Sequence, residues 1–362
     1  MPGLARLTDR RARIAVTAAL GTAGGAAAAG VGMPLPWMLG PMSACVVAAL
    51  AGLPLAAPQG LRPVVIPVIG VMLGAGFSPD ILGQLGAWAG TFAALPVFLA
   101  VAGGASWLFY TRIGRYDART AFFCAAPGGL NEMILMGEEA GGDARRIALA
   151  HAVRIFCVIM AIALAFALFG GTTTSGMAGT WTRFSDVPAG EAAALLACAV
   201  LGTPLARLAR LPAAGLFGPM ALSAGLHLSG LVAAPPPSLL VILAQLVIGT
   251  ILGSRFSGAR LSETGRDLAL GLGATLLLLA VTLAFALGLG RLTQAPWSQA
   301  VLAFAPGGLA EMSLLALAKG QDVAYVATAH VARIVVVLLA VRPLFGAIGA
   351  RLDGPSVDDP ES

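Results

Sequence analysis

Charged residues are scarce in this sequence. They make up 11% of its 362 residues, whereas a soluble globular domain carries about 25%. Hydrophobic residues make up 58%. The uncharged run from Leu268 to Gly290 is long enough to cross a hydrocarbon core of about 30 Å. The composition leaves no room for a soluble catalytic domain and predicts an all-α, multi-pass membrane protein.

Histidine and cysteine are also few, with three and four copies respectively. None of the cysteines has the CxxC spacing of a redox or metal-binding motif. We therefore expect small buried apolar side chains rather than disulfides or metal ligands, and we predict neither a metal nor another cofactor. The four are Cys45, Cys124, Cys157 and Cys198.

The basic N-terminus has two interpretations. Four arginines between Arg6 and Arg13 precede the first apolar stretch, as in the n-region of a cleaved signal peptide. The alternative, which we favour, is an uncleaved first helix with a basic cytoplasmic flank. At the other terminus, residues 350–362 are short and acidic, and we expect them to be disordered.

The sequence contains an internal duplication. A displacement of 179 residues places APGGLNEM, residues 126–133, on APGGLAEM, residues 305–312. The same displacement places His151, Arg154 and Asp143 on His330, Arg333 and Asp322, and a displacement of 178 places Gly40-Pro41-Met42 on Gly218-Pro219-Met220. A repeat of this length predicts two related membrane units, residues 1–188 and 189–349, followed by the acidic tail.

Each unit shows five apolar spans and one Pro-Gly-Gly segment between the fourth and fifth spans. That segment is either a broken crossing or a re-entrant helix. The predicted spans are Ile14–Gly30, Leu35–Leu53, Val64–Phe77, Gly86–Tyr110 and Ile147–Phe169 in the first unit, and Ala189–Leu205, Ala213–Val232, Leu239–Leu252, Leu268–Gly290 and Val323–Ile348 in the second.

The placement of arginine predicts that the two units are inverted in the membrane. Cytoplasmic loops collect Lys and Arg. The loop after the fourth span holds Arg112, Arg115 and Arg119 in the first unit but only Arg291 in the second. Equivalent loops therefore face opposite sides, which requires an odd number of crossings per unit. We predict ten spanning helices, two Pro-Gly-Gly segments that enter from opposite faces, and both termini in the cytoplasm.

The Pro-Gly-Gly segments have the composition of a backbone binding site. Proline ends a helix because it lacks an N–H group, and glycine lets a ligand approach the backbone closely. Non-helical backbone is tolerated at membrane depth only where protein or a water-filled cavity satisfies it. The helix that restarts after the break offers free N–H groups to an anion. The predicted backbone site comprises Pro127, Gly128 and Gly129 together with Pro306, Gly307 and Gly308.

An acid follows each break at the same offset. Glu132 and Glu311 are predicted to couple protons or another cation, because a buried carboxyl group readily takes up a proton. The alternative is an ordinary acid in the first turn of a helix. Asn131 is an accessory candidate, and Ala310 replaces it in the second unit, so the two sites are not equivalent.

A histidine and an arginine follow in each unit at a spacing of three, which places them on one helix face. An arginine buried inside a membrane span usually has a function, because burying its charge costs free energy. One hypothesis is that Arg154 and Arg333 hold an anionic substrate or neutralise the glutamates, with His151 and His330 relaying protons or donating hydrogen bonds. The other hypothesis is a structural Glu–Arg lock between the broken segment and the next helix.

Two aspartates lie in polar stretches just before the fifth span of each unit. They are Asp143 and Asp322, and we expect each to cap the helix that follows.

The twinned APGGLxEM motif, with AHxxRI downstream in a duplicated apolar chain, resembles the membrane AbrB duplication family over nearly the whole sequence. Members are labelled ammonia monooxygenases or AbrB-family regulators of gene expression. A copper oxygenase needs a cluster of imidazole ligands, and three histidines divided between two units do not predict one. No basic recognition helix lies outside the apolar spans, so we expect no direct contact with nucleic acid.

Inverted repeats with interrupted helices are the usual plan of secondary transporters. We therefore expect a transporter of a small anionic solute in the bacterial inner membrane, with the lipid bilayer, the solute and protons as partners. The alternative is a membrane sensor that affects gene expression indirectly. An enzyme, in particular an ammonia monooxygenase, is the least favoured of the three.

Overall fold

The computed structural model describes residues 9–77, 83, 85–169, 181–211, 213–259, 261–293 and 296–352. Within these residues the secondary structure is entirely helical, with fourteen α-helices and no strands, which confirms the all-α prediction. The helices are α1 (Arg10–Gly30), α2 (Pro36–Leu50), α3 (Arg62–Gly74), α4 (Leu85–Leu108), α5 (Ala118–Ala125), α6 (Leu130–Glu139), α7 (Ala144–Phe169), α8 (Ala189–Leu208), α9 (Ala214–Leu228), α10 (Ser238–Gly253), α11 (Leu261–Thr293), α12 (Trp297–Phe304), α13 (Leu309–Ala318) and α14 (Val323–Leu352).

Seven of these helices are long and apolar enough to cross a membrane: α1, α4, α7, α8, α10, α11 and α14. The other three predicted spans form α2, α3 and α9, which have 15, 13 and 15 residues. At a rise of about 1.5 Å per residue, such helices are shorter than a hydrocarbon core of about 30 Å. The multi-pass class is therefore confirmed for the described residues, while ten full crossings stay a prediction.

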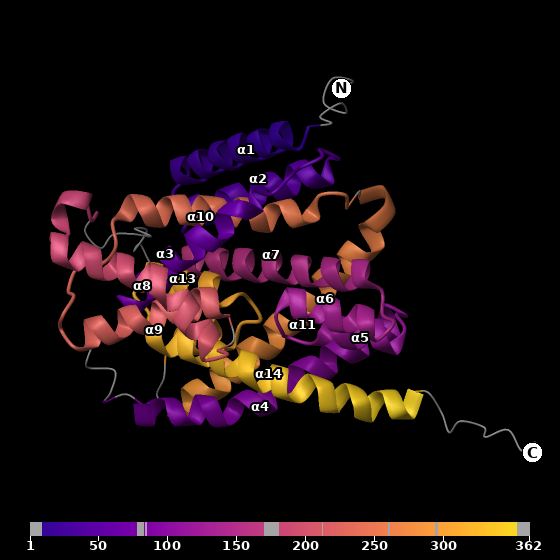
Figure 1. Ribbon diagram of the computed structural model, residues 1–362. Coiled ribbons are helices and arrows are strands. Elements are labelled where there is room, and N and C mark those ends of the chain that lie inside the picture. Colours follow the sequence, from indigo (N-terminus) through magenta and orange to yellow (C-terminus); the bar gives the residue numbers. More distant parts are fainter. Residues whose placement is uncertain are drawn as a thin grey trace, which may run out of the picture.

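The helix bundle runs mainly in one direction, as Figure 1 shows for α7, α10 and α14. Helices α1 and α2 lie on one side of this bundle and α4 lies on the other. Helix α7 is the most buried of the candidate spans. It lies at the centre because its apolar residues contact neighbours on several sides, including α11, α5, α6 and α10.

Glycine allows the closest helix contacts in the bundle. A Cβ atom added at Gly249 of α10 would collide with the carbonyl oxygen of Met38 in α2. A Cβ atom added at Gly70 of α3 would meet the carbonyl oxygen of Leu216 in α9 at 2.6 Å. Small residues at such crossings let backbones approach closely, which is how helices associate within lipid.

Candidate functional site

Both Pro-Gly-Gly segments interrupt a helix. Helix α5 ends at Ala125 and α6 begins at Leu130, while α12 ends at Phe304 and α13 begins at Leu309. In each break the second glycine is the N-cap of the next helix and has an extended backbone, with φ and ψ of −65° and 137° at Gly129 and of −80° and 151° at Gly308. The predicted helix breaks are therefore confirmed.

Each interrupted segment folds back on itself as a helical hairpin. In the α5–α6 hairpin, the N–H of Asp143 donates to Oγ1 of Thr120 at 2.8 Å, so the exit of the segment lies beside its entrance. In the α12–α13 hairpin, the hydroxyl of Ser298 donates to Oε1 of Gln321 at 3.1 Å in the same way. The two ends of each segment therefore lie side by side, as the re-entrant form of the prediction requires, and entry and exit on one membrane face stay a prediction.

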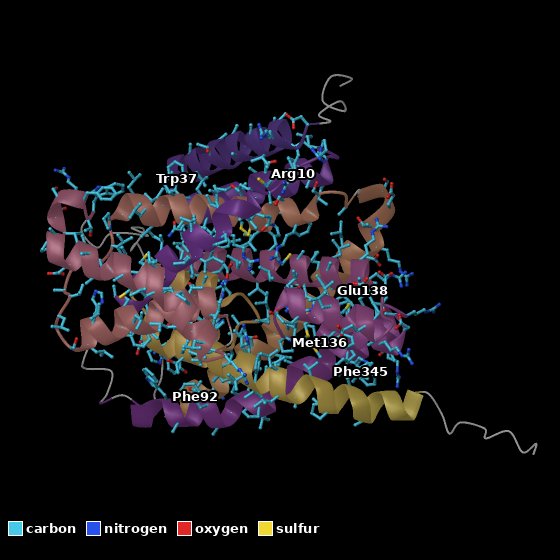
Figure 2. The ribbon with its side chains drawn as sticks, viewed as in Figure 1. Arg10, Trp37, Phe92, Met136, Glu138 and Phe345 are labelled. Atoms are coloured by element: carbon cyan, nitrogen blue, oxygen red, sulfur yellow. The ribbon has the colours of Figure 1, made fainter. Side chains whose placement is uncertain are left out.

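The two hairpins contact opposite ends of the long helices. The α5–α6 hairpin contacts α7 near His151 and Arg154, whereas the carbonyl of Phe166, near the other end of α7, accepts a bond from Lys319 after α13. Figure 1 shows α5 and α6 at the end of the bundle where α14 finishes, with α13 nearer the opposite end. In Figure 2, Met136 and Glu138 of α6 lie at the same end as Phe345 of α14.

Arg154 and His151 hold the first break. The Nη1 atom of Arg154 donates to the carbonyl of Ala126 at 3.1 Å, and Nη2 lies 2.8 Å from Nδ1 of His151. The other ring nitrogen of His151 lies 2.8 Å from the carbonyl of Phe123. That carbonyl would normally accept from the residue four positions on, which is Pro127, and proline has no N–H to give.

Arg333 holds the second break. Its Nη1 atom donates to the carbonyl of Ala305, and Nη2 donates to the carbonyl of Gly307 at 2.7 Å. His330 differs from its counterpart. Its Nδ1 lies 3.0 Å from the carbonyl of Val326 within the same helix, and its buried Nε2 has no partner. The two hairpins therefore use their arginines alike and their histidines differently.

Both arginines are buried and keep unused donors. Arg154 is 5% exposed, Arg333 is 4% exposed, and the Nε of each has no hydrogen-bond partner. Among the described residues neither guanidinium forms an ion pair with a carboxylate, so the arginines do not lie against the glutamates.

The twinned glutamates lie in the first turn of α6 and of α13. Each carboxylate folds back over the glycine at the N-cap, where a Cβ atom at Gly129 or Gly308 would collide with it. Glutamate at this position favours a helix N-terminus. Their surroundings differ, because Glu132 is exposed whereas Glu311 is only 8% exposed. Asn131 also lies in the first turn of α6, and its side chain is outside the described part of the structure.

The two predicted helix caps are confirmed. An oxygen of Asp143 accepts from the N–H of Arg146 at 3.0 Å at the start of α7. An oxygen of Asp322 accepts from the N–H of Tyr325 at 3.0 Å at the start of α14.

The carbonyl groups that the arginines bind were not predicted from the sequence. Those of Ala126, Ala305 and Gly307 belong to the breaks, and a carbonyl has no signature because every residue carries one. Proline signals a different carbonyl, the one four residues earlier, which at Pro127 is that of Phe123 and is bound by His151. In the described part of the chain, no group of three or more His, Cys, Asp or Glu side chains is arranged to hold a metal ion.

These features define the chain as a helical, multi-pass membrane protein with two helical hairpins, each held by a buried arginine. It belongs to the AbrB family, because the family model described as "Transition state regulatory protein AbrB" matches residues 37–349. The family resemblance drawn from the twinned motif is thereby confirmed.

Two bacterial relatives match most of the chain. One is "Putative regulator AbrB" of Escherichia coli (strain K12), 27% identical over 310 residues, which cover 85% of this chain and 88% of the relative. The other is "Uncharacterized protein YhjN" of Bacillus subtilis (strain 168), 26% identical over 351 residues, which cover 90% of this chain and 91% of the relative. No solved structure matches the chain.

Proposed function

We propose that the chain is a secondary transporter of a small anionic solute, bound between the two hairpin breaks. One observation carries this proposal: Arg154 and Arg333 are buried, each keeps an unpartnered Nε–H, and among the described residues no carboxylate neutralises them. A buried charge without a counter-ion is costly in a membrane. An anion held between the two guanidinium groups would supply both the missing charge and the missing acceptors.

We also propose that residues 1–188 and 189–349 are inverted repeats. Reciprocal contacts support this, because Gly249 approaches the carbonyl of Met38 while Gly70 approaches that of Leu216. Gly70 and Gly249 are equivalent at a displacement of 179, and Met38 and Leu216 at 178. Equivalent residues of the two units therefore make the same contact with the other unit. A two-fold axis between the units produces this relation. Transporters built this way bind solute where the repeats meet.

In this proposal the site residues have separate roles. The breaks at Pro127-Gly128-Gly129 and Pro306-Gly307-Gly308 present backbone to the solute, and the arginines supply positive charge. Glu311 is the better placed of the two glutamates to couple a proton or another cation, because it is buried while Glu132 is exposed. His151 positions Arg154, to which it is bonded directly.

For the membrane we propose the bacterial inner membrane, with both termini in the cytoplasm. The end of the bundle that carries α5 and α6 also carries the end of α14 and Arg10 at the start of α1 (Figures 1 and 2). Arg112, Arg115 and Arg119 precede or begin α5, so the most basic loop belongs to that end. Basic loops stay in the cytoplasm.

The proposal is tested first by ligand-dependent thermal stability. The purified full chain is heated with a panel of small anions, including carboxylates, phosphate and sulfate. A bound anion should raise the melting temperature, because a ligand that binds only the folded state stabilises it. The rise should disappear in Arg154→Ala and in Arg333→Ala and persist in Arg207→Ala, which removes an exposed arginine. No rise with any anion, or a rise that both site variants keep, would contradict the proposal.

The E. coli relative is named a regulator, which favours a sensor that binds the same solute without moving it. Net flux of the stabilising anion into liposomes containing the protein separates the two functions. A transporter accumulates the anion when a proton gradient is imposed, and a sensor does not. We propose no enzymatic reaction for this chain.

A further inference from the structure

A second candidate binding site lies at the base of the α12–α13 hairpin, and no residue of either helix break lines it. It is a groove of about 400 Å³ between α7, α11 and α12, which we call the Lys319 groove. Its polar end consists of Trp297, Ser298, Lys319 and Gln321, and the rest is lined by apolar side chains of α7 and α11 such as Phe166 and Leu283. This volume falls in the range of about 300–1,000 Å³ that small-molecule sites occupy.

The apolar part of the groove opens toward lipid. Leu283 in its wall is 45% exposed, and its neighbours on the same face of α11, Leu276 and Leu287, are 58% and 47% exposed. On α7, the flanking Leu164 and Leu168 are 58% and 68% exposed. These helices are candidate membrane spans, so exposed leucines on them face acyl chains. An acyl chain can therefore enter the groove sideways without passing through water.

The polar end carries a positive charge that the described residues leave uncompensated. Lys319 is the only lysine in the sequence, among 22 basic residues. Its ammonium donates one bond, to the carbonyl of Phe166 at 3.3 Å, and forms no ion pair in the described part of the chain. An ammonium has three donors, so two remain for a ligand. Ser298 and Gln321 lie beside it and are bonded to each other.

Lys319 lies at the depth in the membrane where lipid headgroups lie. Phe166 lies three residues before the end of α7, so Lys319 lies near the end of a membrane span rather than at its centre. Trp297, which is 51% exposed, lies at the same end of the groove. Tryptophan and lysine at the ends of spans lie at the level of the headgroups. We propose that the Lys319 groove binds a phospholipid with an anionic headgroup, whose phosphate contacts Lys319 and whose acyl chain lies along α7 and α11.

The test compares two phospholipids with the same acyl chains, phosphatidylglycerol and phosphatidylcholine, added to the purified full chain in a neutral detergent. Phosphatidylglycerol should raise the melting temperature to a saturating value, and phosphatidylcholine should raise it far less. The difference should be lost in Lys319→Gln, which removes the charge, and kept in Lys319→Arg. In Ala165→Phe, which fills the groove next to Phe166, both lipids should lose their effect.

The remaining outcomes overturn the proposal. Equal effects of the two lipids would show that the charge of Lys319 does not select the ligand. A lipid effect that survives in Lys319→Gln and Ala165→Phe would place the lipid elsewhere. A full effect with the free fatty acid alone would make that acid the occupant instead. Arg154→Ala and Arg333→Ala should keep the lipid effect, so failure of this proposal and failure of the anion site are distinguishable.

Discussion

At the scale of single residues, proline determines which backbone carbonyl at the helix break must bond to a side chain. Pro127 removes the N–H that would have bonded the carbonyl of Phe123, and His151 takes its place at 2.8 Å. The same histidine holds Arg154 through its other nitrogen. His151 is thus a positioning residue with two partners. His330, at the equivalent place, is bonded only to the carbonyl of Val326 in its own helix.

This difference predicts unequal effects of the same substitution. His151→Leu should lower the free energy of unfolding by about 1–3 kcal/mol, because it leaves a buried carbonyl and an arginine donor without partners. His330→Leu should cost clearly less, because the carbonyl of Val326 keeps its helical position and no other partner is lost. Thermal or chemical unfolding of the two purified variants measures this. Equal losses would mean that His151 does not hold the break.

At the scale of elements, hydrogen bonds join the two ends of each hairpin. In the α5–α6 hairpin, Nη1 of Arg119 donates to the carbonyl of Ala140 at 3.3 Å. The N–H of Asp143 donates to Oγ1 of Thr120, whose side chain is fully buried. The break itself is held from α7 by Arg154. A hairpin therefore has two separate attachments, one at its tip and one at its base, and each can be removed without the other.

Thr120→Val should loosen the base of the α5–α6 hairpin, since valine has the same shape but accepts no hydrogen bond, while the bond from Arg119 to Ala140 remains. The free energy needed to open residues 140–143 should fall by about 1–3 kcal/mol, which is the cost of leaving a buried N–H unsatisfied. Amide hydrogen exchange at these residues measures that opening. The matched control is Thr282→Val, because the hydroxyl of Thr282 is equally buried and bonds only to Leu278 of its own helix. Unchanged exchange in Thr120→Val would show that this bond does not close the hairpin.

At the scale of the whole molecule, the two hairpins reach the centre from opposite ends of α7 and α14. Rings of Phe123 and Phe345 lie 5.0 Å apart, near the end of α14, whereas Arg333 binds the other hairpin in the first half of that helix. If these helices cross the bilayer as we propose, one hairpin enters from each face. The proposed inversion of the two units would have the same consequence.

Cysteine labelling checks this arrangement. In a background in which the four natural cysteines are alanine, Glu139→Cys reports the base of the first hairpin and Trp297→Cys that of the second, and both side chains are exposed. An impermeant reagent should label Trp297→Cys in intact cells, whereas Glu139→Cys should react only after the membrane is opened. Labelling of both from the same side would refute the inverted arrangement.

Most of the helices were predictable from the sequence, because a backbone inside lipid has few ways to satisfy its hydrogen bonds. Long apolar runs must become helices, so every predicted span coincides with a helix over most of its length. The spans predicted at Leu35–Leu53, Val64–Phe77 and Ala213–Val232 extend past the ends of α2, α3 and α9. Proline and glycine marked the breaks, and aspartate marked the starts of α7 and α14, because these effects act within a few residues of the chain. The end of the first predicted unit before residue 188 and most of the tail predicted to be disordered, residues 350–362, lie outside the described residues, which omit 170–180 and 353–362.

By itself, the sequence determined the membrane class, the family, the interrupted helices and the identity of the buried charges. Only the tertiary structure decided that the interrupted segments turn back as hairpins, that both arginines bind backbone carbonyls rather than the twinned glutamates, and that Glu311 is buried while Glu132 is exposed. The physical reason is that these outcomes depend on contacts between residues far apart in the chain. A local pattern specifies where a helix must stop, but the partner of the freed carbonyl comes from whichever helix packs beside it.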